Sequence, residues 1–333
     1  RICFVHNVKQ AKRKGIDCNS RIVVWGLKEN RAAVNLAKRH GIHIEHMEDG
    51  FIRSVGLGSD FARPSSLILD RRGIYFNPRQ PSDLEKLLNT VNLDQKAKQR
   101  ARRLQQHIVK AGINKYNNGC KGKLVVNASP RQTVILVPGQ VEDDASIRVG
   151  CAEIRTNLGL LQEVRRKNPN AYLIYKPHPD VIAGNRQGRI SNHLAQRYCD
   201  QIVTEHHMSI CLNQVDQVHT MTSLTGFEAL LKKKQVFTYG LPFYAGWGLT
   251  TDQLGIDRRR RKLTLEELIY GCLVLYPRYV NWDFGCFVEA EDTVRMLDKQ
   301  QEGACAVISA SYFRRWVRKA LYLLADMQIV WAK

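Results

Sequence analysis

The chain has 333 residues and is 44% hydrophobic, enough for two compact domains of about 150 residues each. Its 51 Lys and Arg residues outnumber 31 Asp and Glu residues, and the resulting formal charge of +20 indicates anionic partners without specifying which. No run of about 20 apolar residues suggests a membrane-spanning helix, and nine dispersed cysteines without a CxxC pair favour reduced thiols over a zinc site or disulfides.

In the first part of the chain, short apolar runs alternate with helical patterns. Ala33, Val34, Leu36 and Ala37 recur at helical spacing before Gly41, which predicts a helix over residues 29–41. The other elements expected here are strands at 1–7, 21–26 and 43–48, a hairpin of 66–70 and 73–77, a helix at 81–91 and a basic helix at 94–115.

The same alternation restarts after the Asn- and Gly-rich segment 115–123, which we take as a domain boundary. Strands are expected at 133–140, 171–180, 201–206, 217–223 and 236–240, and helices at 157–169, 209–215, 224–235 and 263–276. This pattern predicts an α/β fold of two facing Rossmann-like domains. We assign residues 1–120 to the first domain, 121–290 to the second and 291–333 to C-terminal helices.

Two basic clusters do not by themselves identify a nucleic-acid-binding protein. Residues 96–123 contain nine Lys or Arg and no acid, and RRRRK follows at 258–262. Neither cluster is interleaved with aromatic residues, as a single-strand stacking surface would be, and no zinc-finger, RRM or KH signature occurs. We therefore expect no nucleic-acid partner.

Ligands of open parallel sheets collect at the carboxyl ends of strands, and two acidic segments lie at such positions. Glu48 and Asp49 follow the strand at 43–48 and form either a simple turn or a general base. Asp143 and Asp144 follow the strand at 133–140 and form a helix cap, a divalent-metal site or a nucleophilic carboxylate.

Two further segments after strands carry groups that bind phosphate. In YKPHPD, Lys176 and His178 lie between prolines and form a candidate phosphate clamp. In TMTSLTGFEALL, Ser223 and Thr225 mark a helix N-terminus, an anion site. In that segment Gly226 would let a ligand approach the backbone, and Glu228 would bind ribose hydroxyls or form a capping box. Together the four segments fit a nucleotide-sugar transferase.

Five ordered motifs closely resemble those of the KpsC-type β-Kdo transferases of capsule polysaccharide biosynthesis. They are EDGFIRSVGLG (48–58), PGQVEDDAS (138–146), YKPHPD (175–180), TSLTGFEALL (222–231) and VFTYGLPFYAGWGLTTD (236–252). The resemblance implies a GT-B-like fold, a single module of a tandem enzyme, and retaining transfer of Kdo from CMP-β-Kdo that builds the β-Kdo linker on a phosphatidylglycerol lipid. It also implies a cytoplasmic, peripheral location at the inner membrane of a Gram-negative bacterium, with other capsule-assembly proteins as partners.

The resemblance assigns roles to the acidic residues. Retention by two successive inversions needs a carboxylate nucleophile, for which Asp144 is the first choice and Asp143 the second. Glu48 would deprotonate the acceptor hydroxyl. A more distant likeness to bacterial sialyltransferases leaves open an inverting reaction, which would need Glu48 but not Asp144. A non-catalytic polysaccharide-assembly module is the remaining alternative.

The resemblance also implies a donor site for CMP-Kdo. The residues expected to hold the donor are Gln140, Lys176, His178, Ser223, Thr225, Gly226 and Glu228, with His178 also assisting departure of the CMP phosphate. Arg53 and Arg148 are candidates for neutralising the carboxylate on the anomeric carbon of Kdo. Because CMP has one phosphate, we expect no metal and no other cofactor.

The C-terminal segment 311–331 has apolar residues at helical spacing with arginines between them. They include Phe313, Trp316, Leu321 and Leu324. The pattern predicts a helix that either packs back on the first domain or lies on an anionic membrane.

Overall fold

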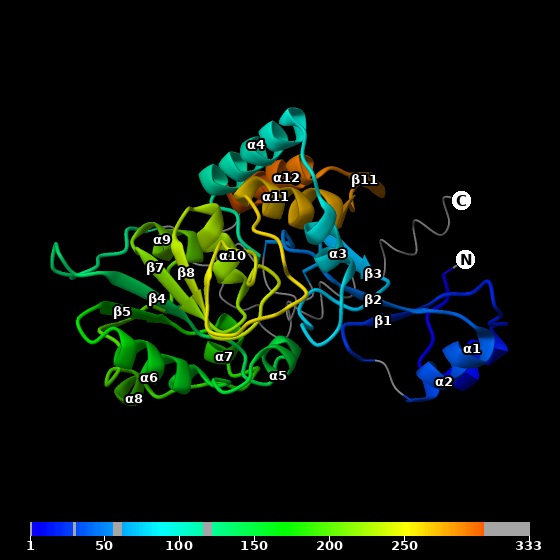
Figure 1. Ribbon diagram of the computed structural model, residues 1–333, viewed down its shortest axis with the longest axis horizontal. Coiled ribbons are helices and arrows are strands. Elements are labelled where there is room, and N and C mark those ends of the chain that lie inside the picture. Colours follow the sequence, from blue (N-terminus) through cyan, green and yellow to red (C-terminus); the bar gives the residue numbers. More distant parts are fainter. Residues whose placement is uncertain (1, 29–30, 56–61, 116–121, 303–333) are drawn as a thin grey trace.

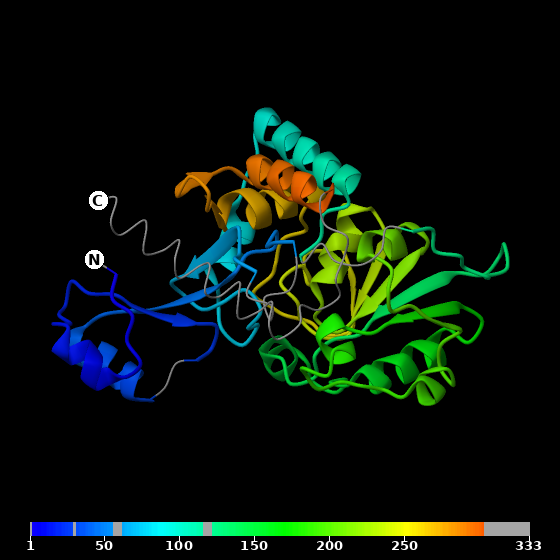
Figure 2. The same cartoon turned by 180° about the vertical axis from the view of Figure 1, so that it is seen from behind.

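The computed structural model of the protein describes residues 2–28, 31–55, 62–115 and 122–302. Two β-sheets lie side by side, and a group of helices covers the region where they approach each other (Figures 1 and 2). The helix predicted at 311–331 lies outside the described residues.

The first sheet is mixed and has the strand order β1-β2-β3-β10-β11. β1 (Ile22–Trp25) runs parallel to β2 (Ile44–Asp49), whereas β3 (Ser66–Asp70), β10 (Arg278–Asn281) and β11 (Cys286–Val288) continue the sheet antiparallel. Helices α1 (Val8–Arg13) and α2 (Arg31–His40) lie at the end remote from the second sheet (Figures 1 and 2). The α/β class is confirmed, but only β1 and β2 form a parallel pair here.

Two strands predicted in the first 80 residues are absent from the described residues, so these predictions were wrong. Residues 2–5 are exposed and form no strand, because this apolar run has no core to pack against. Residues 73–77 form a turn rather than the second arm of a hairpin. The buried carboxylate of Asp70 explains that turn, since it accepts hydrogen bonds from three backbone N–H groups and from the Tyr276 hydroxyl. The chain after β3 therefore folds around this acid.

The second sheet is parallel throughout and has the order β6-β5-β4-β7-β8-β9. Its strands are β4 (Val134–Pro138), β5 (Tyr172–Lys176), β6 (Gln201–Ile202), β7 (Gln217–Thr220), β8 (Gln235–Thr238) and β9 (Thr251–Asp252). Helices α5 (Ala145–Gly150), α6 (Asn157–Lys167), α7 (Pro179–Ile182) and α8 (Asn192–Ala195) lie toward one side, and α9 (Met208–Asn213) and α10 (Leu224–Leu231) toward the other (Figure 1).

Alternating residues of β4 separate two hydrophobic cores. Ile135 and Val137 pack with Leu160 and Leu161 of α6, whereas Leu136 faces a larger core that extends to Ile68 of β3. Adjacent residues of a strand point to opposite faces of the sheet. Because both faces are buried here, nearly every residue of β4 is apolar, which explains the continuous apolar run in the sequence. The larger core joins the two halves of the molecule, of which the first is built around the sheet β1-β2-β3-β10-β11 and the second around the sheet β6-β5-β4-β7-β8-β9.

A helical layer completes this joint core. It contains α3 (Asp83–Thr90), α4 (Gln95–Ala111), α11 (Leu265–Ile269) with the π-helical turn η2 (Tyr270–Leu275), and α12 (Ala290–Glu302). α12 packs on α4 and β10, and Arg100 of α4 contacts Glu289 and Glu291 at 2.6 and 2.8 Å. Helix α12 thus packs on the first half. The boundary expected at residue 290 differs from the sheet topology, because β10 and β11 already belong to the first sheet.

Candidate active site

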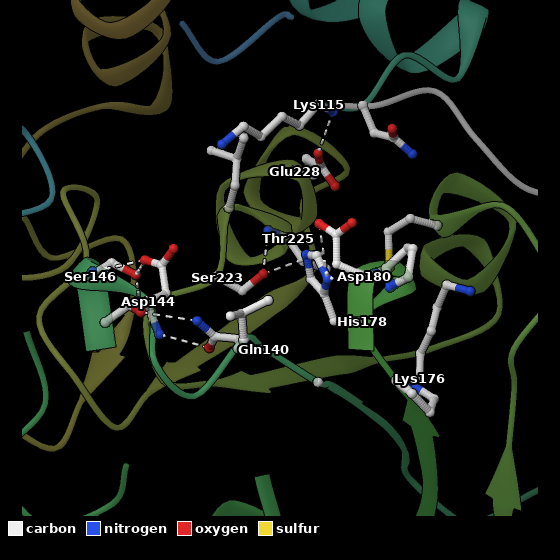
Figure 3. Close-up of a pocket in the computed structure, with 18 of the residues that line it drawn as sticks. Lys115, Gln140, Asp144, Ser146, Lys176, His178, Asp180, Ser223, Thr225 and Glu228 are labelled. Atoms are coloured by element: carbon white, nitrogen blue, oxygen red, sulfur yellow. Dashed lines mark hydrogen bonds and ion pairs between the residues drawn. The ribbon is translucent and has the colours of Figure 1, made fainter. Parts of the chain in front are cut away.

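A pocket of about 310 Å³ opens between the two halves, beyond the carboxyl ends of β4, β5 and β7 (Figure 3). This is where an open parallel sheet binds its ligands. The second half supplies most of the lining. The first half supplies Glu48, Tyr75, Phe76, Asn114 and Lys115.

The acidic run 142–144 divides its side chains between different tasks. Asp144 lines the pocket and caps α5, with Oδ1 accepting from the Ser146 N–H at 2.8 Å and from the Ser146 hydroxyl at 2.7 Å. Asp143 is exposed, lies outside the pocket lining and pairs with Arg186 at 3.1 Å. Glu142 bonds to the backbone at the start of α6. The helix cap and the carboxylate in the pocket are therefore the same residue.

The side-chain amide of Gln140 ties the end of β4 to the segment after β7. Its oxygen accepts from the Thr220 hydroxyl at 3.2 Å and from the Thr222 N–H at 3.0 Å, while its nitrogen donates to the Thr222 hydroxyl at 3.0 Å. The Thr222 hydroxyl also lies 3.1 Å from that of Ser146. Gln140 lines the pocket, and its amide fixes the two strand ends that carry Asp144 and Ser223 (Figure 3).

Lys176 and His178 both lie in the pocket, on the segment that leaves β5. Lys176 is 6% exposed, its Nζ lies 3.4 Å from the Thr204 carbonyl oxygen, and burial lowers the pKa of its ammonium group. His178 caps α7, with Nδ1 accepting from the Asp180 N–H at 3.1 Å. Burial lowers the pKa of His178, so at pH 7 the ring is neutral and carries its proton on Nε2.

The N-terminus of α10 faces the pocket. Ser223 caps this eight-residue helix by accepting from the Thr225 N–H at 3.2 Å, and its hydroxyl contacts that of Thr225 at 3.1 Å. Such a helix start attracts anions through free N–H groups and the helix dipole. The Tyr244 hydroxyl donates to the Ser223 carbonyl oxygen and holds this turn from behind.

Gly226 is not a pocket residue. A Cβ atom at this position would lie 2.2 Å from the Tyr244 hydroxyl oxygen. The glycine was expected to let a ligand approach the backbone, but it instead makes room for Tyr244.

Glu228 connects the two halves across the pocket. It accepts from the Lys115 N–H at 3.0 Å (Figure 3). A capping box is ruled out, because the third position of α10 is Gly226 rather than Glu228. Burial raises the pKa of Glu228 to about 7, so the carboxyl titrates near neutrality.

Glu48 reaches the pocket from the carboxyl end of β2. Burial raises the pKa of Glu48, the charge of Lys115 opposes this rise, and the charges of Asp49 and Asp144 add to it. A carboxylate with a raised pKa is a better proton acceptor near neutral pH than an ordinary one. Glu48 and Asp144 thus approach one space from different halves of the molecule.

Neither arginine expected to bind the donor carboxylate lines the pocket. Arg53 is buried, bonds to Asp49 at 2.5 Å, and donates to the Ser54 hydroxyl and the Ala62 carbonyl. Arg148 is exposed near the end of α5. The structure therefore does not bring either arginine into the described pocket lining. The sequence does not reveal that Asp49 pairs with Arg53 or that Arg148 is exposed.

Several lining residues were missed by reasoning from the sequence. They are Tyr75, Asn114, Lys115, Ser146, Asp180, Arg186, Thr222 and Phe243. Ser146, Asp180 and Thr222 lie within the quoted motifs, so polar residues next to strand ends were the available signal. Lys115 stands at the segment interpreted as a domain boundary, where no periodicity points to a pocket.

In the part of the chain that the structure describes, no helix combines the length and apolar character needed to cross a bilayer. The same part of the chain holds no cluster of three or more His, Cys, Asp and Glu residues arranged for a metal ion.

Comparison with known proteins identifies relatives along most of the chain. Residues 20–118 and 102–279 match the family described as capsule polysaccharide biosynthesis protein. The capsule polysaccharide modification protein LipA of Neisseria meningitidis is 49% identical over 301 residues, 90% of this chain and 42% of LipA. The lipopolysaccharide-processing protein LpsZ of Rhizobium meliloti is 41% identical over 283 residues, 84% of this chain and 64% of LpsZ. The chain thus spans less than half the length of LipA.

Two solved structures are also similar, both of Thermosulfurimonas dismutans KpsC and both at 36% identity. The β-Kdo 2,4 transferase has a TM-score of 0.75, covering 83% of this chain and 86% of its own. The β-Kdo 2,7 transferase has a TM-score of 0.68, covering 88% and 89%. These matches confirm the GT-B-like α/β fold. The chain therefore belongs to the capsule polysaccharide biosynthesis family and is of the KpsC type.

Proposed function

We propose that this chain is a retaining glycosyltransferase that moves Kdo from CMP-β-Kdo to a lipid-linked Kdo acceptor and so builds the β-Kdo linker of a capsular polysaccharide. The observation that carries the proposal is the placement of Asp144 in a pocket that also holds an anion-binding helix start and a second carboxylate, Glu48. The β-Kdo transferase structures named above support the sugar and the donor class.

The donor phosphate is assigned to the start of α10. There the Ser223 and Thr225 hydroxyls, the N–H groups of the first turn and the Lys176 charge all favour an anion. Neutral His178 donates Nε2–H to the phosphate and stabilises the departing CMP. A single phosphate is neutralised by these groups, so the proposal includes no metal.

Asp144 is assigned as the nucleophile. In the first step a carboxylate oxygen forms a bond to the anomeric carbon as the bond to the CMP phosphate oxygen breaks, which inverts the centre. The cap of α5 uses Oδ1 of Asp144, so its bonds to Ser146 orient the carboxylate. Asp143 is less suited, because it lies outside the pocket and pairs with Arg186.

Glu48 is assigned as the general base of the second step. It takes the proton of the acceptor hydroxyl while that oxygen attacks the anomeric carbon and displaces Asp144, which restores the β configuration. The raised pKa of Glu48, caused by burial, favours this role. Once protonated, Glu48 returns its proton to water.

A lipid-linked acceptor would bring the enzyme to the cytoplasmic surface of the inner membrane. Exposed aromatic residues on the β10–β11 hairpin support this address, since Trp282, Phe284 and Phe287 are 40%, 81% and 78% exposed, and Arg63 lies over the Trp282 ring. Aromatic side chains with nearby cations suit the interface of an anionic bilayer.

Vesicle co-sedimentation tests the membrane contact. Wild-type protein should pellet with phosphatidylglycerol vesicles more than with phosphatidylcholine vesicles, and a Phe284→Ser/Phe287→Ser variant should pellet less. Val125→Ser, at a residue that is 61% exposed on the other half, is the matched control. Equal pelleting of both variants and wild type would place the contact elsewhere.

The anomeric configuration of the product tests the reaction. Wild type is incubated with CMP-β-Kdo, generated in situ, and a Kdo-terminated lipid analogue, and the new linkage is assigned by NMR. A β product that is lost with Asp144→Asn but kept with Asp143→Asn supports the proposal. An α product would support the inverting alternative, as would transfer from CMP-sialic acid but not from CMP-Kdo in a parallel incubation. Folded protein without any transfer would indicate a non-catalytic assembly module.

A further inference from the structure

The donor carboxylate lacks a partner among the residues first expected to bind it. Kdo carries this group on the anomeric carbon, so it lies beside the bonds that change. Asp144 and Glu48 both approach that carbon with negative charge, and like charges in a partly buried pocket disfavour binding. A cation near both carboxylates is therefore required.

The described pocket lining includes three Lys and Arg side chains. Lys176 is buried at the end of β5 and is assigned above to the donor phosphate. Arg186 pairs with Asp143, with 41% of its side chain exposed. Both lie on the second half of the molecule, whereas the third, Lys115, enters from the first half.

The backbone of Lys115 is held between the halves. Its N–H donates to Glu228 of α10 at 3.0 Å, and its carbonyl accepts from the Ser54 N–H at 3.4 Å. Its side chain extends across the pocket toward the side on which Asp144 and Ser146 lie (Figure 3). Lys115 and Asp144 line the same pocket, together with Glu48, Tyr75 and His178. The two side chains thus border one space.

We propose that the Lys115 ammonium group binds the carboxylate on the anomeric carbon of the donor and thereby positions that carbon against Asp144. This inference rests on the proposed function. A lysine suits the task because its compact charge can offset two nearby carboxylates without closing the space that the acceptor must enter. The contact also makes the site specific for sugars that bear an acid at the anomeric carbon.

The test compares Lys115→Met and Lys115→Arg with wild type. Methionine keeps most of the apolar length of lysine and removes only the charge, and the bond from the residue 115 backbone N–H to Glu228 is retained in every variant. Lys110→Met, an exposed residue of α4 outside the pocket lining, is the control with the same change in net charge.

Two quantities are measured, the dissociation constant of CMP and the kcat/KM for CMP-Kdo. CMP has no sugar carboxylate, so Lys115→Met should leave its affinity within about twofold while kcat/KM falls about 100-fold, the scale of losing one charge-stabilising group. Lys115→Arg should recover part of the loss, and Lys110→Met should match wild type.

The outcomes separate this inference from the proposed function. Wild-type transfer with Lys115→Met at full kcat/KM would overturn the role of Lys115 and leave the function intact. An equal loss of CMP affinity would also overturn it, because Lys115 would then hold the nucleotide or the fold. Wild type that binds CMP but transfers no Kdo would remove the proposed function and the inference together.

Discussion

Substituting Gly226 by alanine should displace Tyr244 and, with it, the Ser223 turn of the proposed donor site. The new Cβ atom would lie 2.2 Å from the Tyr244 hydroxyl oxygen and 2.6 Å from the carbon that bears it. Tyr244 is fully buried, so neither group can move without shifting its neighbours. Overpacking costs about 1–3 kcal/mol, and loss of the bond from Tyr244 to the Ser223 carbonyl adds about 0.5–1.5 kcal/mol.

These magnitudes set the expected measurements. We expect Gly226→Ala to lower the melting temperature by at least about 3 °C, since 1 kcal/mol corresponds to about 2–4 °C in domains of 150–250 residues. The affinity for CMP should fall about tenfold, because the displaced Ser223 turn carries the phosphate-binding N–H groups. Gly255→Ala is the control, as a Cβ there meets no atom within 4 Å. A Gly226→Ala protein that melts and binds CMP like wild type would refute the reasoning.

Three further predictions follow from buried charges. Glu48→Gln should slow transfer at least about 100-fold, and the glycosyl-enzyme should accumulate. Because burial raises the pKa of Glu48, the wild-type rate should fall as the pH drops through a value above the ordinary 4.5. A pH–rate profile whose acid limb lies below 4.5 would contradict this role. Glu228 binds its proton more tightly in the folded state than in the unfolded state, with a pKa of about 7 against 4.5. The free energy of unfolding should therefore fall by up to about 3 kcal/mol as the pH rises from 4.5 to 7. Urea unfolding of Glu228→Gln should lack this pH-dependent fall, and the same pH dependence in the variant and wild type would refute the prediction. Arg53→Leu leaves the partly buried carboxylate of Asp49 without its cation and should destabilise the fold by up to about 3 kcal/mol. Arg148→Leu, at an exposed residue, should change neither urea stability nor the KM for CMP-Kdo. Similar urea stability of the two variants would refute a stabilising role of the Arg53–Asp49 pair.

The second half was predictable from sequence because its parallel strands are buried on both faces. Runs such as VILVP (134–138) and YLIYK (172–176) are nearly all apolar and end at the pocket, so the strand ends also located Asp144, Lys176 and Ser223. The first half was less predictable, since β10 pairs with β3 more than 200 residues earlier in the chain and β11 then pairs with β10. Local sequence patterns carry no record of such long-range pairing.

The same limit applied to individual side chains. Arg53 and Lys115 are both cations near candidate motifs, yet one is fixed by Asp49 and the other reaches the pocket. Their difference depends on which segments meet in three dimensions. Gly226 was misread for the same reason, because its neighbour Tyr244 lies 18 residues further along the chain.

The central claim is that Asp144 forms a covalent bond to the sugar. The most direct measurement is the intact mass of the protein after incubation with CMP-Kdo without acceptor, for wild type, Asp144→Ala and Asp143→Ala. We expect a gain of one Kdo residue in wild type and Asp143→Ala and none in Asp144→Ala. An Asp144→Ala protein that gains no mass but still transfers Kdo to acceptor at the wild-type rate would contradict the double displacement and leave Glu48 as the sole catalytic carboxylate.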